Sequence, residues 1–363
     1  MTAHIVDQLQ QAGGWLPFDR FMAMALYTPG LGYYANDLAK LGRMPSDGSD
    51  FVTAPELSPW FGHVLAGQIN EALQATQTHD VWEFGAGSGA LAFDVLTALD
   101  ALRPTAPVSY HIVDVSGALR ARQQARLQAW AGRVHWHDQW PQAFEGVLVG
   151  NEVLDAMPVQ LLVRKQGVWH ERGVAWHNEA WVWSDRPTHL RPAVAIEGEH
   201  DYLTEIHPQA EAFVASLAEH WTRGLAFFID YGFEEAAYYH PQRHMGTLMC
   251  HQGHRADPDP LVSVGLKDIT AHVNFTGVAV AAQNAGLLTL GYLGQGRFLL
   301  NAGLMQAMAH APVPEQAQAL KLVHEHEMGE LFKVWAVAPQ ATVDALPSWW
   351  PTGFAHGDRS HAL

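Results

Sequence analysis

Apolar residues recur at helical spacing from the start of the chain to about residue 75, and this pattern predicts three helices. The expected helices cover 5–12, 18–25 and 56–75. Two turn-rich loops with many aromatic residues separate them, at 27–34 and 49–58, and loops of this kind often carry binding residues. We therefore expect residues 1–75 to form an N-terminal helical segment with lid loops.

The pattern changes between residues 76 and 159, where short apolar strands alternate with helices. The expected strands cover 81–84, 109–115, 133–137 and 146–150, and the helices cover 89–102 and 117–130. Such alternation is typical of an α/β protein with a mostly parallel, doubly wound sheet. Residues 76–159 are thus predicted to form the first half of this core.

An antiparallel insertion is expected over 160–205, because segments at 160–165, 168–175 and 180–184 are short and alternate in polarity. The α/β pattern then returns over 206–340, which we assign to the second half of the core. The elements expected there are a helix at 208–221, a strand at 225–230, a helix at 314–325 and a strand at 332–337.

The last of these strands is expected to lie antiparallel at the edge of the sheet, as is common in mixed sheets. Residues 341–363 are left as a C-terminal tail. Beyond Pro347 this tail is expected to be poorly ordered, although Trp349 and Trp350 could dock against the core.

Glycines cluster directly after the first core strand, at Gly85, Gly87 and Gly89. They allow a tight turn, and the helix that follows presents unpaired N–H groups to a ligand. The spacing fits a dinucleotide, and Asp114 could hold a ribose hydroxyl of any adenosyl ligand. Glu83 favours S-adenosylmethionine, because a carboxylate attracts its cationic sulfonium and ammonium but repels a pyrophosphate. The pattern thus predicts an adenosyl-type ligand and leaves a nicotinamide dinucleotide as an alternative.

Acidic residues also follow the later strands of the predicted sheet. Ligands of open α/β sheets bind at the carboxyl ends of the strands, so Glu83, Asp114, Glu152 and Asp230 are expected to gather at one site. Glu152 and Asp155 lie three residues apart and could grip a guanidinium, which pairs bidentately with carboxylates. Asp155 could equally be an acid that stabilises a helix N-terminus, and Asp230 a residue that caps a strand turn.

Histidines supply a second set of candidates. His272 could act as a general base or could be a hydrogen-bonded histidine beneath a lid. His240, His244, His251 and His254 are close in sequence, but Pro241 interrupts a helical pairing of the first two. We therefore predict no metal site.

Composition and charge limit the classes of function. The chain has 363 residues and a formal net charge of −16, which argues against a nucleic acid held through its phosphates. Its single cysteine, Cys250, cannot form an intramolecular disulfide and fits a reducing compartment. The first basic residue is Arg20, unlike a secretory signal or a presequence, and no apolar run reaches the roughly 20 residues that span a bilayer. We expect a cytoplasmic protein without membrane contact.

Several motifs together resemble the MidA family of S-adenosylmethionine-dependent methyltransferases, over roughly residues 15–300. They are Tyr27-x-Pro29-x-x-Gly32-Tyr33-Tyr34, Asp50-Phe51-x-Thr53-x-Pro55-Glu56, Glu83-x-Gly85-x-Gly87-x-Gly89, Asn151-Glu152-x-x-Asp155-Ala156-x-Pro158, Asp230-Tyr231-Gly232 and Asp268-x-Thr270-x-x-Val273. The resemblance implies a class I methyltransferase sheet with an added helical and antiparallel subdomain. It implies S-adenosylmethionine as cofactor, S-adenosylhomocysteine as product, and an arginine of a partner protein as acceptor.

The family pattern also implies roles for single residues. Those implied to contact the cofactor are Glu83, Gly85, Gly87 and Asp114, with Thr53, Pro55 and Glu56 in a loop over it, and Asp138 near the adenine. Asn151 and Glu152 are implied at the reacting centre, with Asn151 also near the cofactor, and we add Asp155, with Asp230 or His272 assisting.

Two departures from the family pattern leave the acceptor open. Asn274 stands where the family usually has Asp, and 251–255 replaces a more basic and aromatic run. The alternatives are methylation of a small molecule or of another side chain, and a non-catalytic assembly factor that binds the cofactor structurally. The sequence also leaves a homodimer open.

Overall fold

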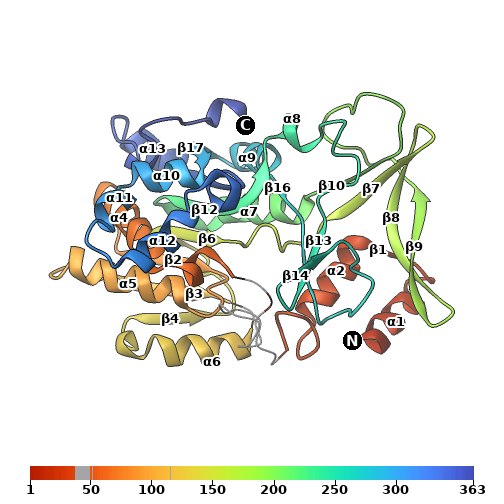
Figure 1. The fold of residues 1–363 in the computed structure, drawn as a ribbon, viewed down its shortest axis with the longest axis horizontal. Helices are drawn as coiled ribbons and strands as arrows, with labels where there is room; N and C mark the ends of the chain where they lie inside the picture. Colours follow the sequence, from red (N-terminus) through yellow and green to blue (C-terminus); the bar gives the residue numbers. More distant parts are fainter. Residues whose placement is uncertain (37–49, 51, 115) are drawn as a thin grey trace.

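A mixed sheet of eight strands organises this computed structural model, which describes residues 1–36, 50, 52–114 and 116–363 (Figure 1). Two residues of predicted elements, Phe51 and Val115, lie outside this range. Seven strands follow the order β17 (Leu287–Gly294), β18 (Phe332–Pro339), β12 (Ala226–Phe233), β6 (Val147–Asn151), β2 (Asp80–Phe84), β3 (Ser109–Val113) and β4 (Val134–His137). The eighth strand, β16 (Val273–Asn274), pairs with the end of β12. From β12 to β4 all neighbours run parallel, which confirms the predicted α/β core.

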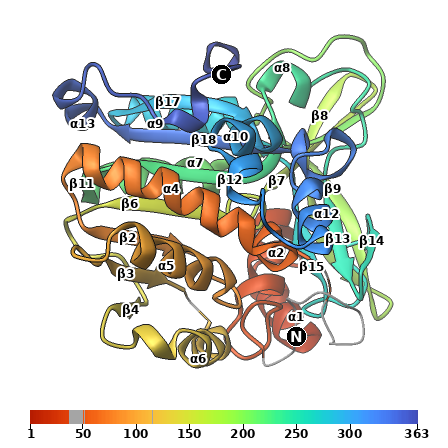
Figure 2. The same ribbon diagram turned by 60° about the vertical axis from the view of Figure 1, so that its left-hand side comes forward.

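Successive side chains of the central strands point to opposite faces, and helices cover both faces (Figure 2). Val147 and Phe227 belong to one core, and their neighbours Leu148 and Phe228 belong to the other. The helices of the first face are α4 (Pro59–Thr76), α5 (Ala90–Leu102), α10 (Gln295–Asn301), α11 (Leu304–Ala307) and α12 (Val313–Lys321). Those of the second face are α7 (Pro208–His220) and α9 (Phe275–Asn284). The remaining core helices are α6 (Gly117–Arg126), α8 (Glu235–Tyr238) and α13 (Gln340–Ala345).

The prediction that the strand near 332–337 lies at the edge of the sheet is wrong. β18 is antiparallel as expected, but it pairs with β12 on one side and with β17 on the other. All eight of its residues are buried, and such continuous burial is typical of an interior strand. β17, which the apolar pattern did not reveal, forms the edge instead.

The helix predicted over 56–75 is divided into α3 (Ala54–Leu57) and α4. Ser58 lies between them in an extended conformation, and its hydroxyl accepts a hydrogen bond from the Trp60 N–H. Pro59 occupies the first turn of α4, where a missing N–H costs nothing. The break lets α3 leave the axis of α4 and lie against the site described below.

Two antiparallel sheets stand beside the core. The larger contains the predicted insertion, with β7 (Gln160–Lys165), β8 (Val168–His177) and β9 (Ala180–Pro187), joined by β10 (Tyr202–Ile206) and the short N-terminal β1 (Leu16–Pro17). The smaller contains β13 (Met249–Gln252), β14 (Arg255–Asp257) and β15 (Asp268–Thr270). Figure 1 shows the smaller sheet and α2 (Phe18–Tyr27) between the core and the β8–β9 hairpin, with α1 (Thr2–Gln11) beside that hairpin.

The C-terminal tail docks onto the core, contrary to the expectation of poor order. Phe354 is buried in the first core, where its ring contacts Phe298. The Gly353 N–H donates to Gln68 Oε1 at 2.7 Å, and the Arg359 N–H donates to the Tyr292 carbonyl at 2.8 Å. Residues from α4 and β17 thus hold a segment whose own sequence carries little periodic signal.

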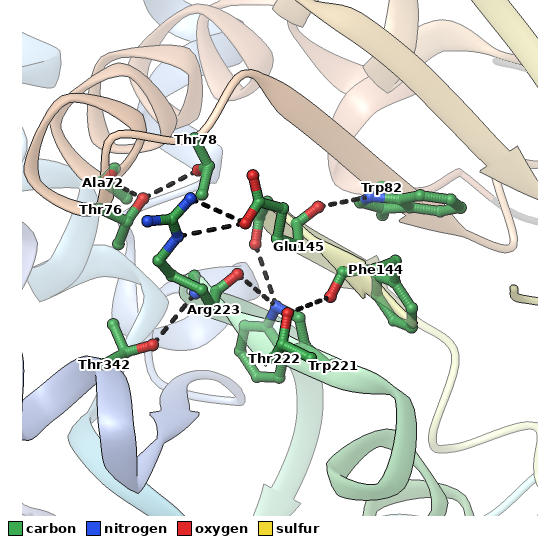
Figure 3. Close-up of polar contacts among 12 residues, drawn as sticks. Ala72, Thr76, Thr78, Trp82, Phe144, Glu145, Trp221, Thr222, Arg223 and Thr342 are labelled. Atoms are coloured by element: carbon green, nitrogen blue, oxygen red, sulfur yellow. Dashed lines mark hydrogen bonds and ion pairs between the residues drawn. The ribbon is translucent and has the colours of Figure 1, made fainter. Parts of the chain in front are cut away.

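The amino ends of the central strands are held by side-chain hydrogen bonds to backbone groups (Figure 3). Trp221, in β11 (Trp221–Arg223), donates from Nε1 to the carbonyls of Gly146 and Arg223 at 3.2 and 3.1 Å. β11 pairs in parallel with β5 (Phe144–Glu145), and the Thr342 hydroxyl accepts from the Gly224 N–H at 3.2 Å. The contacts at the amino ends of these strands therefore serve to hold the sheet together.

Replacing Trp221 by alanine is expected to lower the free energy of unfolding by about 3–5 kcal/mol, because it leaves a large cavity and removes the indole hydrogen bonds to two carbonyls. Urea unfolding followed by circular dichroism measures this loss. Trp350→Ala is the matched control, since Trp350 is 48% exposed and its removal opens no cavity. Equal destabilisation by the two changes would contradict the structural role assigned to Trp221.

Candidate active site

A cavity of about 480 Å³ lies at the carboxyl ends of β2, β3 and β6. Its floor includes the last residues of these strands and the glycine turn that follows β2. Tyr27 and Tyr34 from the N-terminal segment, Thr53 and Pro55 from the start of α3, and Thr270 from β15 also line it. The core, the N-terminal segment and the β13–β15 sheet therefore all contribute to the cavity.

Six carboxylates belong to the otherwise mainly apolar lining of this cavity. They are Glu56, Glu83, Asp114, Glu152, Asp155 and Asp268, and no Lys or Arg belongs to the lining that the described residues form. Glu56 pairs with Arg126, and the other five form no ion pair with the described residues. Buried acids without a cationic partner resist ionisation, because desolvation disfavours the charged form. The cavity is therefore suited to a ligand that supplies positive charge.

Glu83 is the penultimate residue of β2, and Phe84 separates it from the glycine turn. Its Oε2 accepts a hydrogen bond from the Tyr110 hydroxyl at 2.8 Å, and burial raises its pKa to about 8. Gly85 follows with φ +65°, a conformation that favours glycine, and a Cβ there would lie 3.2 Å from Val153 Cγ2. The turn thus needs a glycine at this position, and it presents bare backbone beside a buried carboxylate.

Asp114 follows β3 and lines the same cavity. Its Oδ1 accepts from the Ser116 N–H at 2.9 Å, and its Oδ2 accepts from Gln123 Nε2 at 2.8 Å. Burial raises its pKa, and these two bonds oppose the rise. Each oxygen retains a further lone pair, so the fixed carboxylate can still accept from the hydroxyls of a ribose.

Glu152 stands where the chain leaves β6, and its backbone has φ +53°, which is uncommon for a residue other than glycine. Its carboxylate accepts a hydrogen bond from Asn151 Nδ2 at 3.1 Å and one from the Ala54 N–H. Burial, with the charge of Asp155, raises the pKa of Glu152 to about 8. Residues in rare backbone conformations often occur at functional sites.

Asp230 stabilises the turn that follows β6 through hydrogen bonds to its backbone. Its Oδ2 accepts hydrogen bonds from the N–H groups of Val153, Leu154 and Asp155, at 3.1, 2.9 and 3.2 Å. Asp230 does not line the cavity, so the expectation that it assists catalysis directly is not supported by its position. β12 continues past Asp230 to Phe233. The Asp230 carboxylate therefore lies beside the β6 exit loop, residues 152–155 directly after β6, and positions Glu152 and Asp155.

Asp155 and Asp268 complete the acidic wall. Asp155 forms a hydrogen bond with the Tyr231 side chain, and Asp268 Oδ1 accepts from the Tyr34 hydroxyl at 2.8 Å. Burial raises the pKa of Asp155 to about 6, and burial with the charge of Asp155 raises that of Asp268 to about 8. Asp268 was not among the predicted site residues. It begins β15, which belongs to a separate sheet and is distant in sequence from the other acids. Its only signal in the sequence was its place in the Asp268-x-Thr270 motif.

The α3 loop is tied to the glycine turn, consistent with the predicted place of Thr53, Pro55 and Glu56 over the ligand. Glu56 accepts a hydrogen bond from the Ser88 hydroxyl and pairs with Arg126 Nη1 at 3.2 Å. The same Arg126 nitrogen donates to Ser88 Oγ at 2.6 Å. This network of Glu56, Ser88 and Arg126 was not predicted, and it connects three elements that are distant in sequence.

Asp138 does not line the cavity, and its implied place near the adenine stays a prediction. Its side chain is 82% exposed and forms an ion pair with Arg120. Asp138 lies beyond the end of β4, two strands away from the glycine turn. The ion pair therefore holds Asp138 at the surface.

His272 lines the cavity as predicted, with its ring stacked on Phe233 and edge-on to Tyr231. Burial lowers its pKa to about 4, so it is neutral near pH 7 and is a weak base. Of the four grouped histidines, His251 alone lines the cavity. Within the described residues no cluster of three or more His, Cys, Asp or Glu side chains is arranged to hold a metal ion.

The two departures from the family pattern have different positions. Asn274 is the N-cap of α9, where its Oδ1 accepts from the Gly277 N–H at 3.2 Å. Asn and Asp both serve well as N-caps, so the change has a structural explanation. His251 instead faces the cavity, where a difference can affect the acceptor.

These residues fit S-adenosylmethionine. Glu83 and the glycine turn suit its cationic groups, and Asp114 suits its ribose. Asn151 Oδ1 and Asp155 Oδ1 are buried with no hydrogen-bond partner in the part of the chain that the structure describes, and both are free to accept from a ligand. The fold and the site define an S-adenosylmethionine-dependent methyltransferase of the α/β class.

Comparison with known proteins agrees with this class. Residues 64–293 match the model of a family described as "putative S-adenosyl-L-methionine-dependent methyltransferase", and the chain belongs to this family. A likely methyl transferase from Burkholderia thailandensis, solved with S-adenosylhomocysteine bound, is 48% identical, with a TM-score of 0.94 over 99% of this chain and 96% of that one. These matches confirm the predicted MidA-like resemblance and the cofactor, against a dinucleotide.

Curated relatives carry a more specific name. The "protein arginine methyltransferase NDUFAF7 homolog, mitochondrial" of Drosophila melanogaster is 30% identical over 94% of this chain and 86% of its own length. The human protein arginine methyltransferase NDUFAF7 is 24% identical over 93% of this chain and 83% of its own. Both are named mitochondrial, and a cytoplasmic location for the present chain stays a prediction. Among the described residues no helix is long and apolar enough to span a membrane.

Proposed function

We propose that the protein transfers a methyl group from S-adenosylmethionine to a guanidinium nitrogen of an arginine in a partner protein. The observation that carries this proposal is the wall formed by Glu152, Asp155 and Asp268. Asp155 and Asp268 are buried, Glu152 is half-buried, and none has a cationic partner among the residues lining the cavity. A guanidinium offers five N–H donors in a planar fork that suits paired carboxylates. The names of the curated relatives support the same acceptor.

The proposed roles divide the cavity into two ends. Glu83, Gly85, Gly87 and Asp114 hold the cofactor with Asn151, beneath the loop of Thr53, Pro55 and Glu56. The α2 and β13–β15 segments form the substrate side of an added helical and antiparallel subdomain. Glu152 and Asp155 orient the arginine, with Asp268 behind them.

S-adenosylmethionine supplies an electrophilic methyl group on a positively charged sulfur. As the new N–C bond forms, the S–C bond breaks and its electron pair stays on sulfur. The methylated nitrogen must then lose one proton. Glu152 can accept it, because burial raises its pKa to about 8, close to the working pH. The weakly basic His272 lines the cavity but is less suited to this step.

A pair of short peptides tests the acceptor. One carries a single arginine, and the other carries lysine at the same position. We expect methyl transfer from labelled S-adenosylmethionine to the arginine peptide alone, with the modified nitrogen located by tandem mass spectrometry. Transfer to the lysine peptide, or to small amines in preference to arginine, would contradict the proposal.

The raised pKa values of the cavity acids predict how stability depends on pH. Glu83, Glu152 and Asp268 have pKa values of about 8 in the folded state, above their ordinary values, so the native protein binds more protons than the unfolded chain. The extra bound protons stabilise the native state. This contribution to the free energy of unfolding is complete below the ordinary carboxyl pKa and is lost as the pH rises through about 8. Tm without ligand should therefore fall by about 2 °C or more between about pH 6.5 and pH 8.

A cationic ligand reverses this trend, because it stabilises the ionised acids. The rise in Tm produced by S-adenosylmethionine should be larger at about pH 8 than at about pH 6.5. Scanning fluorimetry at the two pH values, with and without the ligand, measures both effects. Glu83→Gln is expected to reduce the pH dependence of the ligand effect. A ligand-induced shift that is independent of pH would show that these acids do not titrate in the site.

A further inference from the structure

A second groove lies outside the active site, between the β8–β9 hairpin and the loop that joins β14 to β15. Its volume is about 750 Å³. The indole rings of Trp176, Trp181 and Trp183 form the hairpin side, and Leu261 and Leu266 belong to the loop side. None of these residues takes part in the proposed chemistry.

Two aliphatic side chains on the loop side of the groove are exposed. Leu266 is 48% exposed and Val262 is 53% exposed. Exposed apolar side chains that gather at a groove are typical of interaction sites in soluble proteins. The three indoles are half-buried against the core, where Trp181 contacts Phe21 and Trp183 contacts Phe18, so they form an apolar wall of the groove.

The charged residues of the groove are acidic. Glu179 and Asp259 are both exposed, and the lining drawn from the described residues contains no Lys or Arg. The nearby Lys267 does not change this balance, because its Nζ contacts both carboxylate oxygens of Asp257 at 2.8 Å. An apolar groove with an acidic rim is complementary to a segment that combines basic and apolar residues.

The groove is continuous in sequence with the active site. Leu266 lines the groove, Lys267 is buried, and Asp268 lines the catalytic cavity. Lys267 Nζ also donates to the Asp259 carbonyl at 3.2 Å, which ties the loop to the base of β15. One short segment thus contributes to both sites.

We propose that this groove docks a basic and apolar segment of the protein substrate, flanking the arginine that enters the catalytic cavity. The inference rests on the proposed function and adds the place where the substrate is selected. The half-buried tryptophans and the exposed aliphatic residues bind the apolar part of the segment, and Glu179 and Asp259 attract its lysines or arginines. Recognition away from the reacting residue would explain how a cavity suited to any guanidinium could act on a chosen protein.

The probe is a labelled peptide with alternating lysine and leucine residues and a central citrulline, which keeps the shape of arginine without its charge. Fluorescence anisotropy measures its binding, which needs no methyl transfer. Glu179→Lys and Val262→Lys should each weaken binding about tenfold or more, because each places a positive charge at the groove. Glu199→Lys and Val168→Lys are matched controls at exposed positions outside the groove, and should bind like the wild type.

The same peptide with a central arginine tests the link to catalysis. In the groove variants KM for this peptide should rise about tenfold while kcat stays unchanged, and a tripeptide with arginine between two glycines should be unaffected. Failure of the wild type to bind the citrulline peptide, or equal binding by the groove variants, would overturn the docking proposal. Loss of binding in these variants without any arginine methylation would support docking and reject the proposed acceptor.

Discussion

The variant Glu152→Gln is expected to lose methyl transfer by about a thousandfold in kcat while keeping the affinity of the wild type for S-adenosylhomocysteine. Glutamine preserves the size of the side chain and can still accept from Asn151 Nδ2 and the Ala54 N–H. It cannot carry the negative charge that holds a guanidinium, nor accept the proton that the product releases. The effect should therefore appear in turnover and leave cofactor binding almost unchanged.

Turnover is measured with the arginine peptide, cofactor affinity by calorimetry, and folding by Tm. Glu199→Gln is the matched control, since it makes the same change at an exposed position outside the cavity. The control should keep full activity. Full activity in Glu152→Gln would instead move the catalytic role to Asp155 or Asp268. A variant without turnover that still supports function in cells would favour a non-catalytic assembly role.

Gly85→Val is expected to weaken binding of S-adenosylmethionine and S-adenosylhomocysteine by at least about a hundredfold, or about 2.8 kcal/mol. The added Cβ would lie 3.2 Å from Val153 Cγ2 on the β6 exit loop, and the rest of the side chain would occupy the surface offered to the ligand. The backbone at φ +65° also disfavours a branched residue by about 1–2 kcal/mol. Calorimetric titration of both ligands measures the loss.

A second glycine separates strain from loss of the site. Gly167 has φ +79° in the turn between β7 and β8, and a Cβ there meets no atom within 4 Å. Gly167→Val should therefore lower Tm through the same backbone cost while binding both ligands normally. Similar loss of affinity in the two variants would show that reduced stability, and not the glycine turn, explains the effect of Gly85→Val.

The strand-end acids show how far sequence reasoning reached. Three of the four, Glu83, Asp114 and Glu152, do line one cavity, because each stands at or directly after the end of a parallel strand. Asp230 was grouped with them on the assumption that its strand ended there. β12 continues to Phe233, so the carboxylate of Asp230 binds three backbone N–H groups instead. The composition of the strand alone did not fix where it ended.

The local sequence pattern by itself determined the alternating core, the glycine turn, and the preference of the site at that turn for a cationic ligand. Periodicity, backbone freedom and charge depend on residues that are close in sequence. Tertiary structure alone decided that Asp268 joins Glu152 and Asp155, that β18 lies inside the sheet and that the tail is docked. Asp268 and Glu152 are more than a hundred residues apart, and β13–β15 with Tyr34 bring them together. Contacts of that range depend on how elements pack, and one sequence gives no local signal for them.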